Sequence, residues 1–330
     1  MKAAAVEETD KATEITKNGK ALITVTADAR WSKRSYKNNY SSLAGSSSSM
    51  EQAAIVEGFK KSEEYNLIYS KLIADGDSST YKNILESRPY PNIIVQKIEC
   101  SNHLMRNFNG KNIMLCKDKS IPLNQQKLLN SERINRLRIA VRAAVRFRRA
   151  QNYLFTEKVK NLHKDIMNIP KHVFGDHSDC EDYYCSPEKK LEIDNVPNIR
   201  ELMASLISNA SALAYHAQSL IYKLNKNRAE QLNSVIAKYV GGKRINYALK
   251  NSYALRCYAA VVAFNTGTPI YTLYKTISKK SPSAAVKKLE DCKRKANNKR
   301  KLWKAKRRLN FVKENIDYGE SCQKPDMTND

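Results

Sequence analysis

The stretch ALITVTA, residues 21–27, decides the fold, because its β-branched residues and its length are typical of a strand. Two similar runs follow along the chain, LIYSKLI at residues 67–73 and IIVQKIE at residues 93–99. Residues 50–64 carry apolar side chains at helical spacing, and residues 80–86 make a second, shorter helix. The order strand, helix, strand, helix, strand predicts an α/β domain with parallel strands.

An aspartate follows each of the first two predicted strands, Asp28 after the first and Asp75 after the second. Ligands bind at the carboxyl ends of parallel strands, so adjacent strands would bring both carboxylates within reach of one divalent cation. Hard oxygen ligands favour magnesium or manganese, which can activate the nucleophile and stabilise the leaving oxygen in phosphodiester chemistry. Aspartate also commonly ends strands and begins turns, and that alternative stays open.

The rest of the chain is predicted to be helical. Residues 123–165 and 199–240 have the character of long helices, residues 243–278 are mostly helical, and residues 287–313 form a basic helix. Residues 1–20 are polar and are expected to be mobile. The chain is therefore expected to be helix-rich overall.

A large excess of positive charge points to a polyanionic partner. Lys and Arg number 58 against 33 Asp and Glu, which gives a net charge of +25. This balance favours nucleic acid ahead of a membrane surface. The sequence has no apolar run long enough to span a membrane.

The segment RINRLRIAVRAAVRFRR, residues 133–149, holds seven arginines and no acid. On a helix, four arginines share one face: Arg138, Arg142, Arg146 and Arg149. Four apolar residues share the adjoining face: Ile134, Leu137, Val141 and Val145. The apolar face would pack on the protein and the arginines would contact phosphates. A face that is merely solvated remains the alternative.

Further basic clusters lie towards the end of the chain. Residues 287–308 contain twelve Lys and Arg against Glu290 and Asp291. The predicted contacts to DNA are Lys299, Arg300, Lys301, Arg307 and Arg308, and such clusters are also typical of nuclear localisation signals. Lys243 and Arg244 follow two glycines and are further candidates for phosphate contact, without the spacing of a P-loop.

Two histidines and two cysteines fall within fourteen residues: His172, His177, Cys180 and Cys185. Their ligand types match a tetrahedral zinc site, and the glycine and aspartate between them allow tight turns. An odd number of cysteines, seven, without a signal-peptide-like run indicates a reducing compartment. Metal binding is therefore favoured over a disulfide, although an ordinary polar loop stays open as the alternative.

Four motifs occur in an order that resembles the Mutator-like transposases. They are Asp28-Ala-Arg-Trp31, Ala74-Asp75-Gly-Asp77, Cys100-Ser-Asn-His103-Leu-Met-Arg-Asn107 and Asn227-Arg-Ala-Glu230-Gln-Leu-Asn233. The run at residues 239–246 is also similar to arthropod members, so the resemblance covers roughly residues 20–280. Taken alone, the polar cluster around Glu230 is more typical of a helix cap.

The resemblance implies a ribonuclease-H-like (DDE) core interrupted by a large all-helical insertion. Asp28, Asp75 and Glu230 would bind catalytic magnesium or manganese, with Asp77 as the alternative second acid. The residues expected to support this site are Cys100, His103, Asn227 and Asn233. For Cys100 and His103, a small buried cysteine and a core histidine remain the alternative.

These expectations divide the chain into five parts. They are a disordered N-terminus (1–20), the first part of the core (21–110), a helical insertion with the His/Cys segment (115–222), the Glu230 helix with completion of the core (223–280), and a basic C-terminal helix and tail (281–330). Only about 20 residues separate Asp28 from the helix at Met50, too few for the two further strands that such a core contains there. A deletion after Gly45 would leave the sheet incomplete and reduce catalytic competence.

The expected function is metal-dependent DNA cleavage and strand transfer in transposition, in the nucleus. DNA is the expected partner, with no membrane and no small-molecule substrate; association into a homo-oligomer is compatible with the sequence. One alternative is a catalytically inactive or domesticated DNA-binding protein derived from a transposase. A structural nucleic-acid scaffold explains the charge but not the ordered acids.

Overall fold

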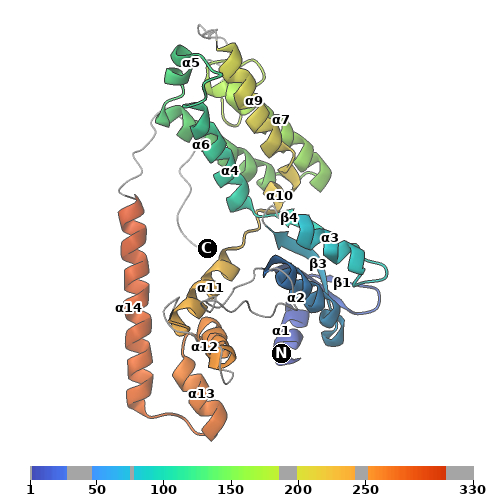
Figure 1. Ribbon diagram of the computed structural model, residues 1–330, viewed down its shortest axis with the longest axis vertical. Helices are drawn as coiled ribbons and strands as arrows, with labels where there is room; N and C mark the ends of the chain where they lie inside the picture. Colours follow the sequence, from blue (N-terminus) through green and yellow to red (C-terminus); the bar gives the residue numbers. More distant parts are fainter. Residues whose placement is uncertain (1, 28–46, 75–77, 186–198, 242–251, 310–330) are drawn as a thin grey trace. The chain divides into compact units, whose positions relative to one another are not determined.

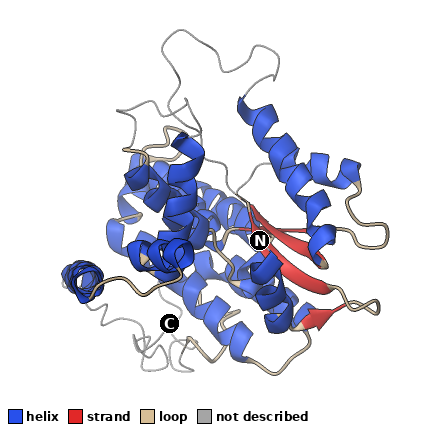
Figure 2. Cartoon of the chain, turned by 90° about the horizontal axis from the view of Figure 1, so that it is seen from below, coloured by secondary structure: helices blue, strands red, loops and turns tan. Residues whose placement is uncertain are grey.

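The computed structural model describes residues 2–27, 47–74, 78–185, 199–241 and 252–309. Helices dominate these residues, and a small mixed sheet accompanies them (Figure 2). The chain forms two compact units: residues 1–72, 77–96 and 226–314 make the first, and the second is built mainly from residues 97–225.

The sheet has the strand order β1-β2-β3-β4. Its strands are β1 (Glu14–Ile15), β2 (Ala21–Thr26), β3 (Leu67–Ala74) and β4 (Gln96–Glu99). β1 pairs antiparallel with β2 through a turn at Gly19, whose φ of 74° favours glycine. The Ala21 amide donates to the Asn66 carbonyl, and Ser70 Oγ donates to the Ile23 carbonyl. Between the first contact and the second, the residue number rises from 21 to 23 on β2 and from 66 to 70 at β3. The two strands therefore run in the same direction, so β2 and β3 are parallel, as predicted.

The N-terminal segment is structured where the sequence suggested a mobile one. Helix α1 (Lys2–Lys11) precedes β1, and Ala5 is buried in a small cluster with Ala21 and Leu67. An alanine gives no strong apolar signal in the sequence, so this contact could be found only once the strands had assembled.

Helices α2 (Ser47–Ser62) and α3 (Ser78–Ser87) pack against each other in the first unit, and the short 3-10 helix η1 (Glu63–Tyr65) follows α2. The Tyr90 hydroxyl is held by Ser62 Oγ at 2.7 Å and accepts the Tyr69 amide at 3.0 Å. This buried hydroxyl therefore joins the end of α2 to β3.

The later part of the first unit is a series of helices (Figure 1). They are α11 (Asn227–Tyr239), α12 (Ser252–Thr266), α13 (Pro269–Ser278) and α14 (Ala284–Leu309). The buried Glu290 carboxylate of α14 accepts the Ile270 and Tyr271 amides at 2.7 and 3.1 Å. It thereby satisfies amides at the start of α13 that have no partner within that helix.

The second unit is a bundle of helices. Its members are α4 (Ser101–Leu115), α5 (Leu123–Leu128), α6 (Ser131–Ala150), α7 (Phe155–Val173), α9 (Arg200–Ala214) and α10 (Ala217–Tyr222). Leu137, Leu162, Ile166, Leu202 and Leu206 are buried at its centre, on α6, α7 and α9. The predicted long helices over residues 123–165 and 199–240 are wrong as single elements. The first breaks into α5, α6 and the first part of α7, and the second breaks into α9, α10 and α11. Asn130 marks one break, where its side chain accepts the Arg133 amide and caps α6.

Candidate metal site and nucleic-acid surface

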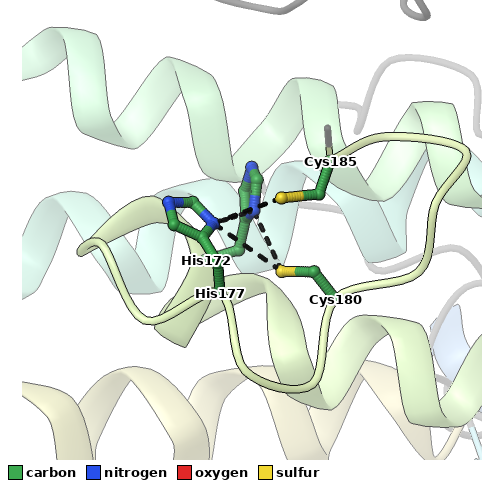
Figure 3. A group of neighbouring side chains, drawn as sticks. All are labelled: His172, His177, Cys180 and Cys185. Atoms are coloured by element: carbon green, nitrogen blue, oxygen red, sulfur yellow. Dashed lines mark hydrogen bonds between the residues drawn. The ribbon is translucent and has the colours of Figure 1, made fainter. Parts of the chain in front are cut away.

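The four predicted zinc ligands lie together at the end of α7 and in the loop that follows. His172 is in the last turn of the helix, and His177, Cys180 and Cys185 come from the loop. Figure 3 shows the four side chains directed towards one another. Their ligand atoms all lie within 4.8 Å of one another, so the structure brings together a set that could hold a metal ion.

The loop folds back because of its local sequence. Gly175 follows α7 with a φ of 95°, a conformation that a residue with a side chain rarely adopts. Asp176 then accepts hydrogen bonds from the Ser178 amide and hydroxyl at 3.1 and 2.6 Å. These bonds lower the pKa of the Asp176 carboxyl and hold a tight turn. The turn brings His177 and Cys180 back towards the helix.

The separations of the ligand atoms fit a tetrahedral centre. Bond lengths of about 2.0 Å to nitrogen and about 2.3 Å to sulfur place neighbouring ligands about 3.3 to 3.8 Å apart. The Nδ1 atoms of His172 and His177 are 3.0 Å apart, and His172 Nδ1 lies 3.2 Å from Cys180 Sγ. His177 Nδ1 lies 3.8 Å from Cys180 Sγ and 3.5 Å from Cys185 Sγ. Small shifts of these side chains would bring their ligand atoms to bonding distance of one ion.

The surroundings of the cluster are apolar and aromatic. Cys180 and Cys185 are buried, and burial together with the neighbouring Cys185 thiol raises the pKa of Cys180 to about 12. The Tyr184 ring packs edge-on against His172 with centroids 5.0 Å apart, and Asn168 donates to Cys180 Sγ at 3.4 Å. Partners of this kind fix the orientation of metal ligands.

A buried ion pair beside the cluster was missed in the sequence. Arg148 of α6 donates two hydrogen bonds to the Asp165 carboxylate of α7, at 2.6 and 2.8 Å. The side chains are only 5% and 1% exposed. Arg148 follows Val141 and Val145 at helical spacing, which places it on the buried face and could have indicated a partner. It therefore joins α6 to α7 inside the bundle and does not belong to the exposed arginine face.

Tyr183 connects the loop that carries the His/Cys cluster to this ion pair. Its hydroxyl donates to Asp165 at 2.9 Å, and its ring stacks on Phe147 of α6 with centroids 3.8 Å apart. Burial, followed by the negative charge of Asp165, raises the pKa of the Tyr183 phenol. The loop is thus fixed to both α6 and α7.

The predicted arginine face lies on α6. Arg142, Arg146 and Arg149 are exposed, whereas Arg138 is half-buried and donates to Asn135 at 2.6 Å. Loss of hydration beside neighbouring protein atoms, followed by the nearby Arg138 charge, lowers the pKa of the Arg142 guanidinium. The adjoining face of the helix carries the buried Leu137, Val141 and Val145, as the periodicity predicted; Ile134 is partly buried.

The acids of the predicted catalytic site are only partly described. Asp28, Asp75 and Asp77 lie outside the described residues. Glu230 is exposed in the first turn of α11, the helix that also carries Asn227 and Asn233. Convergence of the three acids therefore stays a prediction.

Cys100 and His103 lie at the start of α4. Cys100 is buried, and its amide donates to the Ala74 carbonyl at 3.0 Å, so β4 and β3 end side by side. His103 is partly buried one turn into the helix. This placement is compatible with support of a site at the strand ends and with a role in packing.

The basic C-terminal block is helical, as predicted, within α14. Lys299 and Arg300 are exposed. The side chains of Lys301, Arg307 and Arg308 lie outside the described residues, as do Lys243 and Arg244. Contact of this block with DNA stays a prediction.

One known protein family matches part of this chain. Residues 42–185 match the family model for Mutator-like transposases. This transposase match confirms the resemblance over less than half of the chain. It includes β3, β4, α4 to α7 and the complete His/Cys cluster, and it excludes Asp28 and Glu230. Neither the curated proteins nor the solved structures include a match to this chain.

A Mutator-like transposase domain suggests a transposase-type function, with DNA as partner and general use of divalent metal ions. No helix among the described residues combines the length and the apolar character needed to cross a membrane.

Proposed function

We propose that this chain carries out metal-dependent DNA strand cleavage and strand transfer in DNA transposition. The observation that carries the proposal is the arrangement of the ends of β2 and β3, in a chain whose residues 42–185 match the transposase family. β2 and β3 are parallel neighbours, so the residues that follow them leave the sheet at the same edge. Asp28 follows the end of β2 after one residue, and Asp75 directly follows the end of β3. This order supports a shared carboxylate site.

In this proposal, Asp28, Asp75 and Glu230 hold the metal ions, and Asp77 is the alternative second acid. Magnesium or manganese there would activate the nucleophile and stabilise the leaving oxygen. Water attacks a phosphodiester at the element end, and the leaving 3′-oxygen takes a proton to become a hydroxyl. That hydroxyl then attacks a phosphodiester of target DNA and displaces its 3′-oxygen. The protein positions both phosphates for these displacements.

A ribonuclease-H-like core with a helical insertion is part of the proposal. Residues 226–314 belong to the same compact unit as residues 1–72 and 77–96, although a helical unit separates them in sequence. A core interrupted by an insertion produces this discontinuity. The bounds of the helical unit, mainly residues 97–225, are similar to those of the predicted insertion, residues 115–222.

A second candidate is a catalytically inactive or domesticated DNA-binding protein. The observation in its favour is the short distance between β2, which ends at Thr26, and α2, which begins at Ser47. The two strands expected after the first core strand would have to fit within this interval. In either case we propose a nuclear location, supported by the basic clusters of α14.

We also propose that the His/Cys cluster binds one structural zinc ion. Two nitrogens and two sulfurs select zinc over magnesium, and four protein ligands leave no open position for a substrate. The family match includes the whole cluster. Zinc would then fix the loop that carries Tyr183.

A nicking assay tests the catalytic proposal. With magnesium or manganese, we expect the chain to nick supercoiled DNA slowly, because displacement of a carboxylate by about 1 Å can cost two orders of magnitude in rate. Asp28→Ala and Glu230→Gln should abolish the nicking. Glu86→Gln is the control, since Glu86 is an exposed glutamate of α3 that pairs with Lys82. DNA binding without any nicking would favour the second candidate, and nicking that survives both acid variants would refute the assigned site.

Salt dependence tests the arginine face. Each phosphate neutralised on duplex DNA contributes a slope of about 0.9 in log affinity against log salt. Replacing Arg142 and Arg146 with Ala should therefore flatten the slope and weaken binding equally on unrelated sequences. Lys279→Ala with Lys280→Ala, at the end of α13, removes the same charge elsewhere and should change the slope less. An affinity that is insensitive to salt would contradict phosphate contact.

A further inference from the structure

The turn between α6 and α7 exposes three large apolar side chains in succession. Tyr153 is 53% exposed, Leu154 is 71% exposed and Phe155 is 37% exposed. Single exposed apolar residues are normal on protein surfaces, but a contiguous group marks an interaction site. The turn has no role in the proposed cleavage chemistry.

The surroundings of this turn are mainly positive. Arg146 and Arg149 are exposed in the last two turns of α6, and Lys158 of α7 donates to the Arg149 carbonyl at 3.1 Å. Glu157 contributes one negative charge in the first turn of α7. Three cations thus surround the exposed aromatic rings of the turn. This combination suits a polyanion that also offers flat apolar surfaces, and unpaired nucleotides have both properties.

A chain of contacts within the second unit links the turn to the strand ends. The Phe155 ring packs against Tyr222, at the end of α10, with centroids 4.9 Å apart. Ser219 of α10 accepts the Glu99 amide at 3.1 Å, at the end of β4. The next residue, Cys100, bonds to Ala74, which directly precedes Asp75. The aromatic turn is thus joined through α10 to the end of β3, which Asp75 follows in sequence.

We propose that Tyr153 and Leu154 form a stacking site for unpaired bases of DNA, beside the phosphate-binding arginine face. The inference rests on the proposed DNA function and adds a ligand class to it. Every base has a flat face that can stack on an aromatic ring, so the site needs no particular sequence. Paired bases are covered by their neighbours, so the turn would engage frayed ends rather than intact duplex. Holding such an end open would give the strand-end acids access to the phosphodiester.

Binding of two DNA probes by the full chain tests this inference. One probe is a blunt duplex, and the other is the same duplex with a short unpaired strand containing 2-aminopurine, whose fluorescence falls on stacking. The parent chain should bind the second probe more tightly and quench its fluorescence. Tyr153→Ala should weaken that binding about tenfold, remove the quenching and leave binding of the blunt duplex unchanged.

Two control variants make the result specific. Tyr153→Phe keeps the ring and should retain both the affinity and the quenching. Tyr258→Ala removes a tyrosine of α12 that is 69% exposed and should leave both unchanged. Because Tyr153 is exposed, its replacement should leave the fold intact, which amide hydrogen exchange of α6 and α7 verifies.

Each other outcome has a definite meaning. If the parent binds neither probe, the DNA function itself is refuted. If it binds both probes and Tyr153→Ala affects neither, the stacking site is refuted while DNA binding stands. Equal weakening on both probes would assign the turn to duplex contact. If Tyr153→Ala changes only the oligomeric state of the free protein, measured as its mass in solution, the turn is an interface between copies of the chain.

Discussion

Cys180→Ser should release the bound zinc and loosen the end of α7. We expect about one zinc ion per chain in the parent and almost none in the variant, because a tetrahedral site that loses one of four ligands binds metal far more weakly. Structural zinc contributes directly to folding free energy. The amides of residues 174–185 should therefore exchange with solvent at least about tenfold faster.

The effect should reach α6 through Tyr183. This residue stacks on Phe147 and bonds to Asp165, so loss of the loop leaves both contacts unsupported. Amides in the last turns of α6, near Arg146 and Arg149, should exchange with solvent faster as well. DNA binding should then weaken in the variant although no arginine has been changed.

Cys292→Ser is the matched control. Cys292 is an exposed cysteine of α14, outside the cluster, and its replacement should change neither zinc content nor exchange. Equal zinc in Cys180→Ser and the parent, or no zinc in either, would contradict the assignment. Zinc loss without faster exchange would show that the loop is held by its own packing.

Asp165→Asn should destabilise the helical unit more than any surface change. It leaves the buried Arg148 guanidinium with only the exposed Glu181 carboxylate, 3.5 Å away. Breaking a buried pair of this kind costs about 3 to 5 kcal/mol. The Tyr183 hydroxyl loses its ionised acceptor at the same time. Exchange of the buried amides of Leu162 and Ile166 should report this change, because it measures the stability of this unit without assuming that the whole chain unfolds at once.

Two comparisons isolate the ion pair. The double variant Arg148→Met with Asp165→Leu removes both charges and should be less destabilising than Asp165→Asn alone. Glu86→Gln breaks the exposed Lys82–Glu86 pair on α3 and should cost no more than about 1 kcal/mol. If Asp165→Asn costs no more than Glu86→Gln, the pair does not stabilise the bundle.

Local patterns in the sequence determined several elements correctly. The β-branched runs at 21–27 and 67–73 became β2 and β3, because strand propensity and length act over a few neighbouring residues. The apolar stripe of α6 follows equally from helical periodicity. The His/Cys cluster could be predicted because all four ligands lie within fourteen residues, where one helix end and one loop suffice to bring them together.

Only the tertiary structure decided the contacts between distant residues. The burial of Ala5 and the order of the strands depend on which surfaces pack together. No role for Arg148 was predicted from the sequence, and it is Asp165 from the next helix that makes Arg148 part of the core. The link from Phe155 through α10 to the end of β4 joins residues more than fifty positions apart. Periodicity specifies which face of an element is buried, whereas the partner on that face is selected by packing of the assembled chain.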